Sequence, residues 1–353
     1  MLTPEFIRAL PSWSSSLREC KAQVYIYGTG DGCEKALEQL DAEGINVSGI
    51  FTSDDFTAKR SFHGFVLLTV SDIESVSEPV SVVCAFGTDI PEVMQRIERL
   101  AESRVLVYPD TAVIGTGAFG KTSLLERYDD YAAVYSMLSD DLSRRTLDNI
   151  LCFKITGDIK YLSEYSEADD IYALLELGQN EYYADIGAYN GDTAEEFLRY
   201  TGGRYSHICL VEPSRRNFAK CLRNCAELDN ITFINAAASN SDGIGHFSDG
   251  TGRQQSVCEH GEAVSLRSVD SIVGGRPCTY IKYDVEGSDR PALLGSAETI
   301  KLNRPKIRTG IYHRPYDILD IPLLVRDICP GYCFYIRRRR YYPAWDTELI
   351  ALP

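Results

Sequence analysis

The chain has 353 residues and a formal net charge of −15, with 36 lysines and arginines against 51 aspartates and glutamates. This balance argues against a general nucleic-acid binder, because neutralising phosphates requires a surplus of lysine and arginine. The hydrophobic share of 44% and the charged share of 25% are typical of a globular protein, and no apolar run is long enough for a membrane span, so we expect a cytoplasmic protein of about two domains.

Up to residue 110, short apolar runs alternate with amphipathic segments, which predicts parallel strands joined by crossover helices. The expected strands are residues 24–27, 47–51, 81–86 and 105–108, and the expected helices are residues 33–43 and 90–102. The turn Gly28-Thr29-Gly30-Asp31-Gly32-Cys33, with Asp54 and Asp55 after the next strand, resembles a nucleotide-binding turn. Cys33 replaces the third glycine of that fingerprint, however. We expect a Rossmann-like domain over residues 1–110 and leave open whether it binds a nucleotide or sugar nucleotide or is an empty scaffold.

From residue 111 to 177 the pattern is helical and connective, with apolar residues at helical spacing in 131–138 and 142–151. We expect a helical linker subdomain. Residues 115–122 satisfy the Walker A expression. A P-loop, however, lies between a core strand and a helix and needs a magnesium-binding acid on a neighbouring strand. Phosphate binding is therefore not expected at this segment.

The segment from residue 182 to 213 predicts a cofactor site in a third region, residues 178–353. An apolar strand carries Asp185 and turns through Gly187 and Gly191 into a helix, and a second apolar strand ends on Glu212. Glycine permits positive φ and lets backbone amides approach a ligand closely. Glu212 follows the turn by about twenty residues, the spacing at which an acid binds ribose hydroxyls.

Asp185 separates this pattern from a dinucleotide site. A carboxylate before the glycine turn would repel a pyrophosphate but suits a cationic sulfonium cofactor with a free amino group. We therefore predict that S-adenosyl-L-methionine binds here. The predicted cofactor-binding residues are Asp185, Gly187, Ala188, Tyr189, Asn190, Gly191, Asp192, Glu212, Pro213, Ala237, Ala238 and Asp284.

The remaining pattern completes an α/β domain with a mostly parallel sheet. A helix over 214–228 and a strand over 231–235 lead into Ala236-Ala237-Ala238, where small side chains leave room for an adenine ring. Residues 245–270 alternate like short strands, an insertion expected over the sheet edge. The run 279–287 delivers Asp284 and Glu286 to the carboxyl end of a strand, where open parallel sheets bind ligands. The further expected elements are a helix over 290–300, a strand over 306–313, a helix over 316–328, and an antiparallel pair, 332–338 and 347–352.

Residues from about 182 to 353 resemble the FkbM-type methyltransferase family. The matching stretches are residues 185–192, 211–213, 269–272, 281–289, 310–315 and 345–349. The resemblance implies a Rossmann-like class I methyltransferase domain that uses S-adenosyl-L-methionine to O-methylate sugars and other secondary hydroxyls. Two departures are Tyr283, where the family more often has a smaller or apolar residue, and the basic run Arg337–Arg340, whose cations could contact a charged substrate.

Three residues are candidates for the chemistry. His313, at a strand end beside the cofactor crevice, is our first choice for general base, because its ordinary pKa lies near the working pH. The alternative for His313 is a structural histidine before Pro315. Asp284 and Glu286 could instead take the proton, hold the acceptor, or share a divalent cation with Asp270. We rank acceptor binding above metal binding and assign no metal ligand.

The expected partner is a small-molecule or glycan acceptor, and assembly into a homo-oligomer stays open. Two other classes compete with a methyltransferase. The chain could be a catalytically silent S-adenosylmethionine-binding or scaffold protein with a nucleotide-binding N-terminal domain. The first domain could also be a nicotinamide-dependent reductase, although Cys33 and the lack of a Tyr-x-x-x-Lys pair count against that.

Overall fold

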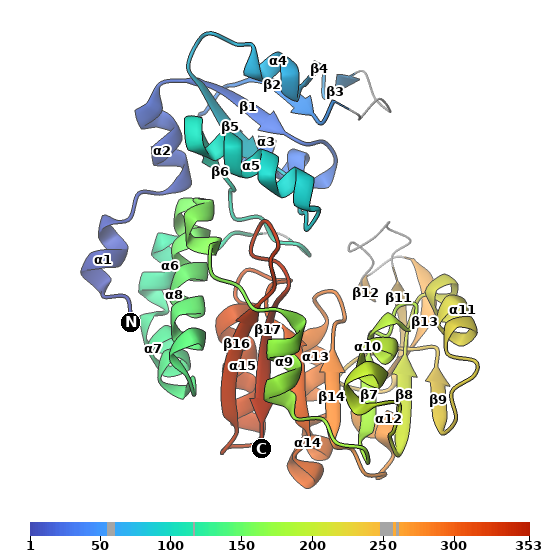
Figure 1. The fold of residues 1–353 in the computed structure, drawn as a ribbon. Coiled ribbons are helices and arrows are strands. Elements are labelled where there is room, and N and C mark those ends of the chain that lie inside the picture. Colours follow the sequence, from blue (N-terminus) through green and yellow to red (C-terminus); the bar gives the residue numbers. More distant parts are fainter. Residues whose placement is uncertain (55–60, 116, 248–256, 259–260) are drawn as a thin grey trace.

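The structure, a computed structural model, describes residues 1–54, 61–115, 117–247, 257–258 and 261–353. Figure 1 shows two layered α/β units, one above the other, with a group of helices at their side. Among these residues, no helix has both the length and the apolar character needed to cross a membrane.

The first sheet has six strands in the order β3-β4-β2-β1-β5-β6. Neighbouring strands are parallel except β3 and β4. The strands are β1 (Gln23–Tyr27), β2 (Val47–Thr52), β3 (Ser61–Phe62), β4 (Phe65–Thr69), β5 (Val80–Cys84) and β6 (Val105–Val107). The helices of this part are α2 (Trp13–Cys20), α3 (Asp31–Ala42), α4 (Val70–Glu74) and α5 (Pro91–Ser103). All predicted strands and helices of this part are present, and the prediction missed α2, α4 and the β3–β4 pair.

Burial explains why this sheet is parallel. All five residues of β5 and four of the five in β1 are buried, as expected for strands covered by helices on both faces. The strand order reverses at β1, because β2 lies on one side of it and β5 on the other. The crevice beyond such a reversal is the usual ligand site of doubly wound sheets.

The helices beside the two units connect them. They are α1 (Pro4–Ala9), α6 (Lys121–Glu126), α7 (Tyr128–Met137), α8 (Asp141–Thr156), the 3₁₀ helix η1 (Ile159–Leu162) and α9 (Ala168–Leu175). The Asp140 carboxylate caps α8 by accepting the Ser143 amide at 2.8 Å, and Gly157 ends the helix with φ +66°. The two predicted helices of this part correspond to α7 and α8.

The second sheet has seven strands in the order β16-β17-β15-β14-β7-β8-β9. Strands β15 to β9 in this order are parallel, whereas β17 is antiparallel to both β15 and β16. The strands are β7 (Tyr182–Ile186), β8 (His207–Val211), β9 (Ile231–Ile234), β14 (Tyr280–Tyr283), β15 (Lys306–Gly310), β16 (Cys333–Arg338) and β17 (Thr347–Leu352). The predicted mostly parallel sheet with an antiparallel C-terminal hairpin is confirmed.

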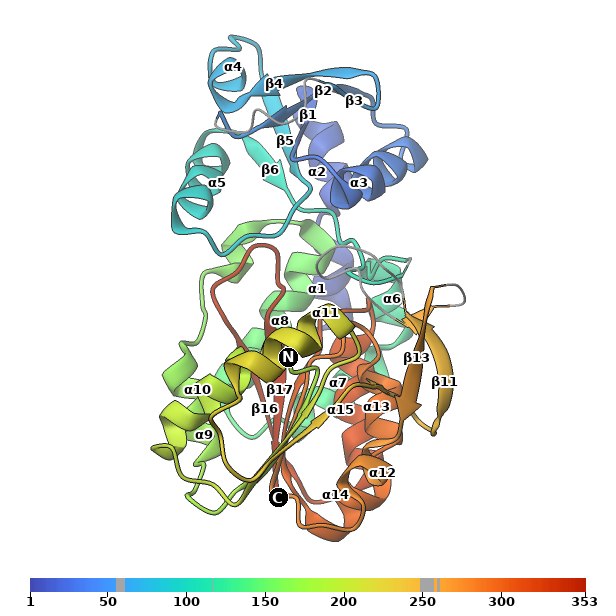
Figure 2. The ribbon, with the colours of Figure 1, turned by 90° about the vertical axis from the view of Figure 1, so that its right-hand side faces the viewer.

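Helices cover both faces of this sheet. Figure 2 shows the sheet nearly edge-on, with α9 and α10 on one side and α12 to α15 on the other. The helices not yet given are α10 (Asp192–Thr201), α11 (Arg215–Asn224), α12 (Val269–Val273), α13 (Asp289–Leu294), α14 (Ala297–Asn303) and α15 (Asp317–Ile328). The expected single helix over 290–300 is wrong, because the chain breaks at Gly295. A Cβ on that residue would lie 2.0 Å from the Ser239 carbonyl oxygen.

The insertion predicted over 245–270 contributes to a separate small sheet, ordered β10-β13-β11-β12. These strands are β10 (Ala237–Ala238), β11 (Gly243–Phe247), β12 (Val257–Cys258) and β13 (Glu262–Arg267). Part of that prediction, residues 248–256 and 259–260, lies outside the described residues. Strand β10 directly follows β9, so this small sheet begins beside the expected adenine position.

Candidate active site

A cavity of about 390 Å³ lies at the carboxyl ends of β7, β8 and β14. This volume is in the range of small-molecule sites. It is lined by Gly187, Tyr189, Asp192, Thr193, Val211, Glu212, Pro213, Asn217, Ala236, Ala237, Ala238, Lys282, Asp284, Val285, Glu286 and Ser288. Strand alternation and the parallel register together bring the three strand ends to one edge of the sheet, which is the position expected from the sequence.

The turn after β7 needs its glycines. Gly187 has φ +95°, and a Cβ there would lie 2.0 Å from the Asp284 carbonyl oxygen. Gly191 has φ +89°, and its Cβ would lie 2.6 Å from the Cys225 Sγ atom. Glycine is therefore required both for the left-handed backbone and for the close approach of neighbouring chain segments.

Two non-glycine residues at the cavity also adopt left-handed backbone conformations. Tyr189 has φ +47° and Glu286 has φ +48°, and both line the cavity. Such conformations are unfavourable for residues with a Cβ and cluster at functional sites. Their presence on two facing loops supports a functional role for this cavity.

Glu212 is buried and held by two backbone amides. Its carboxylate accepts hydrogen bonds from Tyr189 N and Ser214 N, each at 2.9 Å. Burial raises the pKa of Glu212 to about 7, although the two amides oppose that effect. Each oxygen can accept a further hydrogen bond, so the carboxylate is suited to a pair of neighbouring hydroxyls.

Asp185 does not line the cavity, contrary to the expectation that it faces the donor directly. Its side chain is fully buried and accepts a hydrogen bond from the Thr193 hydroxyl. Lys282 stands between Asp185 and the cavity, with its Nζ 3.6 Å from Asp185 Oδ1 and 3.7 Å from Asp284 Oδ2. The negative charge of Asp185 is therefore balanced inside the protein.

Lys282 is the residue that sequence reasoning missed. Burial alone would lower its pKa, but Asp185 and Asp284 outweigh burial and raise the pKa of Lys282, so its side chain stays charged. In the sequence it stands inside an apolar strand, two residues before Asp284 and on the same face. A charged residue in a buried strand, beside a carboxylate on the neighbouring strand, was the available signal.

His313 lies in a cluster of acids beneath the cavity. Its Nε2 atom is 3.4 Å from Asp284 Oδ1 and 3.6 Å from Glu286 Oε2, and its Nδ1 atom is 3.0 Å from Asp289 Oδ2. Burial alone would lower the pKa of His313, but Asp289 and Asp284 outweigh burial and hold this pKa well above its ordinary value. A histidine that carries a proton cannot accept another, which counts against our first choice of His313 as the resting general base.

The other predicted residues divide into two groups. Those that line the cavity are Gly187, Tyr189, Asp192, Glu212, Pro213, Ala237, Ala238, Asp284 and Glu286. Those that shape the surrounding framework are Asp185, Ala188, Asn190, Gly191 and His313. Asp270, named as a partner for a shared cation, instead accepts the Glu298 and Thr299 amides at 3.2 and 2.7 Å. Asp270 therefore caps α14 and does not join the cluster around His313.

The basic run in the last hairpin binds the rest of the chain. Arg337 pairs with Asp140, Arg338 donates to the Leu162 and Glu164 carbonyls, Arg339 pairs with Glu196, and Arg340 pairs with Glu98. Arg337 and Arg338 are both buried. Arg339 is half-buried and Arg340 is exposed. The two buried arginines therefore stabilise the packing of the hairpin, and their ion pairs and hydrogen bonds count against the expected contact with a charged substrate.

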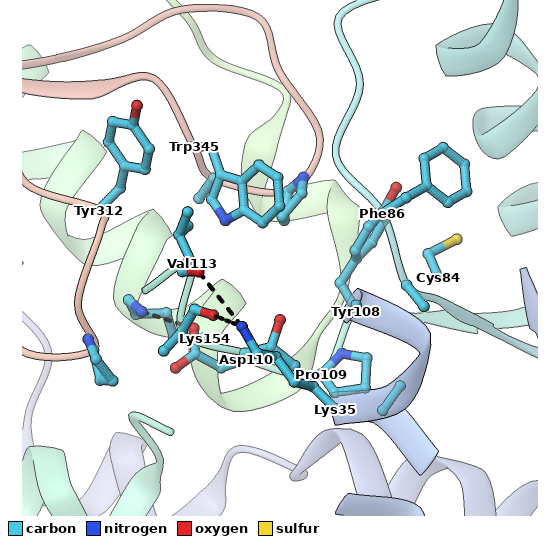
Figure 3. Close-up of a pocket in the computed structure, with 18 of the residues that line it drawn as sticks. Lys35, Cys84, Phe86, Tyr108, Pro109, Asp110, Val113, Lys154, Tyr312 and Trp345 are labelled. Atoms are coloured by element: carbon cyan, nitrogen blue, oxygen red, sulfur yellow. Dashed lines mark hydrogen bonds and ion pairs between the residues drawn. The ribbon is translucent and has the colours of Figure 1, made fainter. Parts of the chain in front are cut away.

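A second cavity, of about 520 Å³, lies between the first sheet and the loops of the second. Figure 3 shows Phe86 and Cys84 on one side and Tyr312 and Trp345 on the other. Its two lysines are already paired: Lys35 lies 2.8 Å from Asp31, and Lys154 lies 2.7 Å from Asp110.

The nucleotide-like turn of the first domain opens into this second cavity. The acids Asp31 and Glu34 follow the turn in the first turn of α3, where they disfavour a phosphate. Asp54 accepts hydrogen bonds from Ser71, and Asp55 lies outside the described residues. The cavity lies at the expected switch point, but its charges do not favour a phosphorylated nucleotide.

The described residues of the Walker-like segment, 115 and 117–122, are not placed as in a P-loop, which directly follows a core strand. Strand β6 ends at Val107, well before this segment, and Lys121 donates to the Arg8 carbonyl oxygen at 3.0 Å. Thr116 lies outside the described residues. The expectation that this segment is no P-loop agrees with this geometry.

Comparisons with known proteins point to one family. Residues 185–329 match the model of the methyltransferase FkbM domain. No curated protein matches the chain. The structure is similar to the methyltransferase FkbM from Methylobacillus flagellatus KT, with a TM-score of 0.72 and 19% identity over 96% of this chain and 92% of that one. At this identity the likeness shows a shared fold.

Two further solved structures resemble part of the chain. They are fibrillarin from Aeropyrum pernix, with natively bound S-adenosyl-L-methionine (TM-score 0.35, 13% identity, 52% of this chain and 74% of that one), and an rRNA methylase from Streptococcus thermophilus (TM-score 0.33, 15% identity, 52% and 92%). At these scores the two likenesses carry no weight for this chain. Residues 185–329 of this chain therefore match the methyltransferase FkbM domain, and the chain shares the fold of a methyltransferase described by that name.

Proposed function

We propose that this protein is an S-adenosyl-L-methionine-dependent O-methyltransferase whose acceptor is a hydroxyl of a sugar, a glycan or a related small molecule. The observation that carries the proposal is the cavity of about 390 Å³, which combines the glycine turn, Glu212 and the Asp284–Glu286 pair. We also propose that the methyltransferase domain extends over residues 178–353, because β7 and β17 belong to one sheet.

The lining suits the parts of the proposed cofactor. Glu212 offers a carboxylate to the ribose hydroxyls, and Ala236, Ala237 and Ala238 leave a flat space for adenine. At the opposite side, Asp284 and Lys282 offer one negative and one positive group. A zwitterionic amino-acid tail has an ammonium for the first and a carboxylate for the second. The Asp284–Lys282 pair therefore fits both charges of the tail, whereas the sequence pointed to Asp185 for the ammonium group.

The cofactor supplies a methyl group on a sulfonium sulfur, and transfer breaks that carbon–sulfur bond as a carbon–oxygen bond to the acceptor forms. The protein must align the acceptor oxygen with the methyl group and receive the hydroxyl proton. Asp284 and Glu286 are both partly exposed to the cavity, so either carboxylate can hold the hydroxyl and take its proton. Asp289 fixes His313 behind them through the 3.0 Å contact to Nδ1.

The acidic lining also supports a neutral, hydroxyl-rich acceptor. Glu286 and Ser288 line the reacting side of the cavity with Asp284, and carboxylates and hydroxyls accept hydrogen bonds from sugar hydroxyls. A negatively charged acceptor would meet like charge at Asp284 and Glu286.

The test is release of S-adenosylhomocysteine from S-adenosylmethionine with a panel of sugars, glycosides and small alcohols. We expect turnover with at least one neutral hydroxyl acceptor and loss of turnover in Glu286→Gln. His63→Ala is the matched control, because His63 is an exposed histidine 3.3 Å from Glu34 and remote in sequence from the cavity lining. Cofactor binding without turnover on any acceptor would instead favour the catalytically silent binding protein.

A further inference from the structure

The strongest unexplained feature of the molecule is the environment of His313. The side chain is fully buried, and Nε2 has no hydrogen-bond partner among the described residues. Buried polar atoms nearly always have a partner, so each exception calls for an explanation. The atom points at two carboxylate oxygens, one from Asp284 and one from Glu286.

The three atoms lie farther apart than the partners of a short charge-assisted hydrogen bond. Charge-assisted bonds between nitrogen and a carboxylate are about 2.7–2.9 Å long, whereas Nε2 lies 3.4 and 3.6 Å from the two oxygens. The three candidate ligand atoms all lie within 4.8 Å of one another. Ligands bound to a cation at about 2.1 Å stand about 3.0 Å apart in an octahedral arrangement and about 3.4 Å apart in a tetrahedral one. The Nε2–Oδ1 distance of 3.4 Å is close to the tetrahedral spacing, and the Nε2–Oε2 distance of 3.6 Å is slightly longer.

The neighbours of the cluster fit the same interpretation. Asp289 is buried and lies 3.0 Å from Nδ1 of His313. Carboxylates in this position behind a metal-binding histidine orient the ring and leave Nε2 to bind the metal. Binding of a cation would displace the proton that His313 carries in its absence. The two oxygens of the Asp284 carboxylate face different partners. Oδ2 faces Lys282, and Oδ1 faces His313. The ion pair with Lys282 therefore uses the other oxygen of Asp284 than the one that faces His313.

We propose that Asp284, Glu286 and His313 bind one divalent cation at the reacting side of the cavity. One imidazole and two carboxylates suit Mn²⁺, Fe²⁺ or Zn²⁺ better than Ca²⁺, which prefers oxygen ligands alone. Because Asp284 and Glu286 line the cavity, a cation held by them would be accessible to the acceptor. This inference rests on the proposed methyl transfer, in which the cation would bind the acceptor oxygen and make its proton easier to remove, and the second carboxylate oxygen of Glu286 would receive that proton.

Manganese binding to the full chain tests the site. After treatment with a chelator, Mn²⁺ is titrated into the protein and free Mn²⁺ is followed by electron paramagnetic resonance. We expect one tight site per chain. Glu286→Gln should bind at least about tenfold more weakly, and the positioning variant Asp289→Asn about 10–100-fold more weakly. His63→Ala, whose histidine faces a single carboxylate, should bind as the wild type does.

Two controls separate misfolding and loss of function from loss of the metal site. Each variant is checked for unchanged thermal unfolding, and binding of S-adenosylhomocysteine is measured on the same samples. No tight Mn²⁺ site in the wild type, or equal binding in Glu286→Gln, would overturn the metal site. If S-adenosylhomocysteine still binds in that case, the proposed methyl transfer stands; if it does not bind either, both proposals fail.

Discussion

Replacing Glu212 by glutamine gives the most quantitative prediction. Glu212 has a pKa of about 7 in the folded protein against an ordinary value of 4.5. At about 1.4 kcal/mol per pH unit, this difference corresponds to about 3 kcal/mol. Because the pKa is higher in the folded state, the folded protein binds the proton more tightly than the unfolded chain does. The stabilising contribution is complete below about pH 4.5 and is lost as the pH rises through about 7.

Glutamine removes this titration at a separate cost. The Tyr189 and Ser214 amides both donate to the carboxylate, and a glutamine amide has one oxygen, so one of these donors loses its acceptor at about 1–3 kcal/mol. The informative quantity is therefore the pH dependence of the difference in unfolding free energy between wild type and variant. Urea unfolding of the ligand-free proteins at several pH values measures it. We expect the difference to change by about 3 kcal/mol between about pH 4.5 and 7.

Cofactor binding should depend on pH in the opposite direction. Ribose hydroxyls donate to the ionised carboxylate, so binding below pH 7 requires Glu212 to release its proton. Wild-type affinity for S-adenosylhomocysteine should rise up to about tenfold per pH unit toward pH 7 and then level off. Calorimetry in two buffers of different ionisation enthalpy measures the released proton. The reasoning is refuted if Glu212→Gln binds with wild-type affinity, or if its proton release equals that of the wild type.

Three further substitutions test separate parts of the structure. Lys282→Met should destabilise the protein by about 3–5 kcal/mol in urea unfolding, because it leaves buried Asp185 without its cation. Adding Asp185→Asn should recover part of the loss. If the unfolding free energies of the two single variants simply add in the double variant, the pairing is contradicted. Gly187→Ala should abolish S-adenosylhomocysteine binding, because its Cβ would meet the Asp284 carbonyl at 2.0 Å; the control Gly203→Ala, with φ +72° but open space around it, should bind normally. Arg337→Met should lower the unfolding free energy by about 1–3 kcal/mol without weakening acceptor binding, because Arg337 pairs with Asp140. Wild-type stability together with reduced acceptor affinity would instead show that Arg337 contacts the substrate.

Much of the fold could be predicted because local and global signals agree. The strand, glycine turn and helix around Gly187 have a strong period and a specific turn chemistry, and the closing hairpin follows directly from alternation in β16 and β17. The requirement for glycine at position 295, between α13 and α14, could not be predicted, because it comes from the Ser239 carbonyl oxygen, more than fifty residues away in the sequence. Contacts of this kind leave no local pattern.

The sequence predicted where the site lies, but it did not predict how the charged side chains of the site pair with one another. Gly187, Glu212, Asp284, Ala237 and Ala238 line the cavity, since each lies at or just beyond the end of a strand. The pairing of Asp185 with Lys282 depends on the register between β7 and β14, which sets these two residues side by side. The roles of Arg337 and Arg338 depend on how α8 and η1 pack against the hairpin. The sequence shows which residues are charged, whereas the tertiary structure decides which residue of opposite charge lies beside each of them.

The central claim is that the cavity at the carboxyl ends of β7, β8 and β14 binds a sulfonium methyl donor. Isothermal titration of the purified full chain with S-adenosylhomocysteine tests it most directly, with Glu212→Gln titrated in parallel. We predict saturable binding of one molecule per chain, clearly weakened by the substitution. Absence of binding to the wild-type chain, or binding that Glu212→Gln leaves unchanged, would contradict the claim.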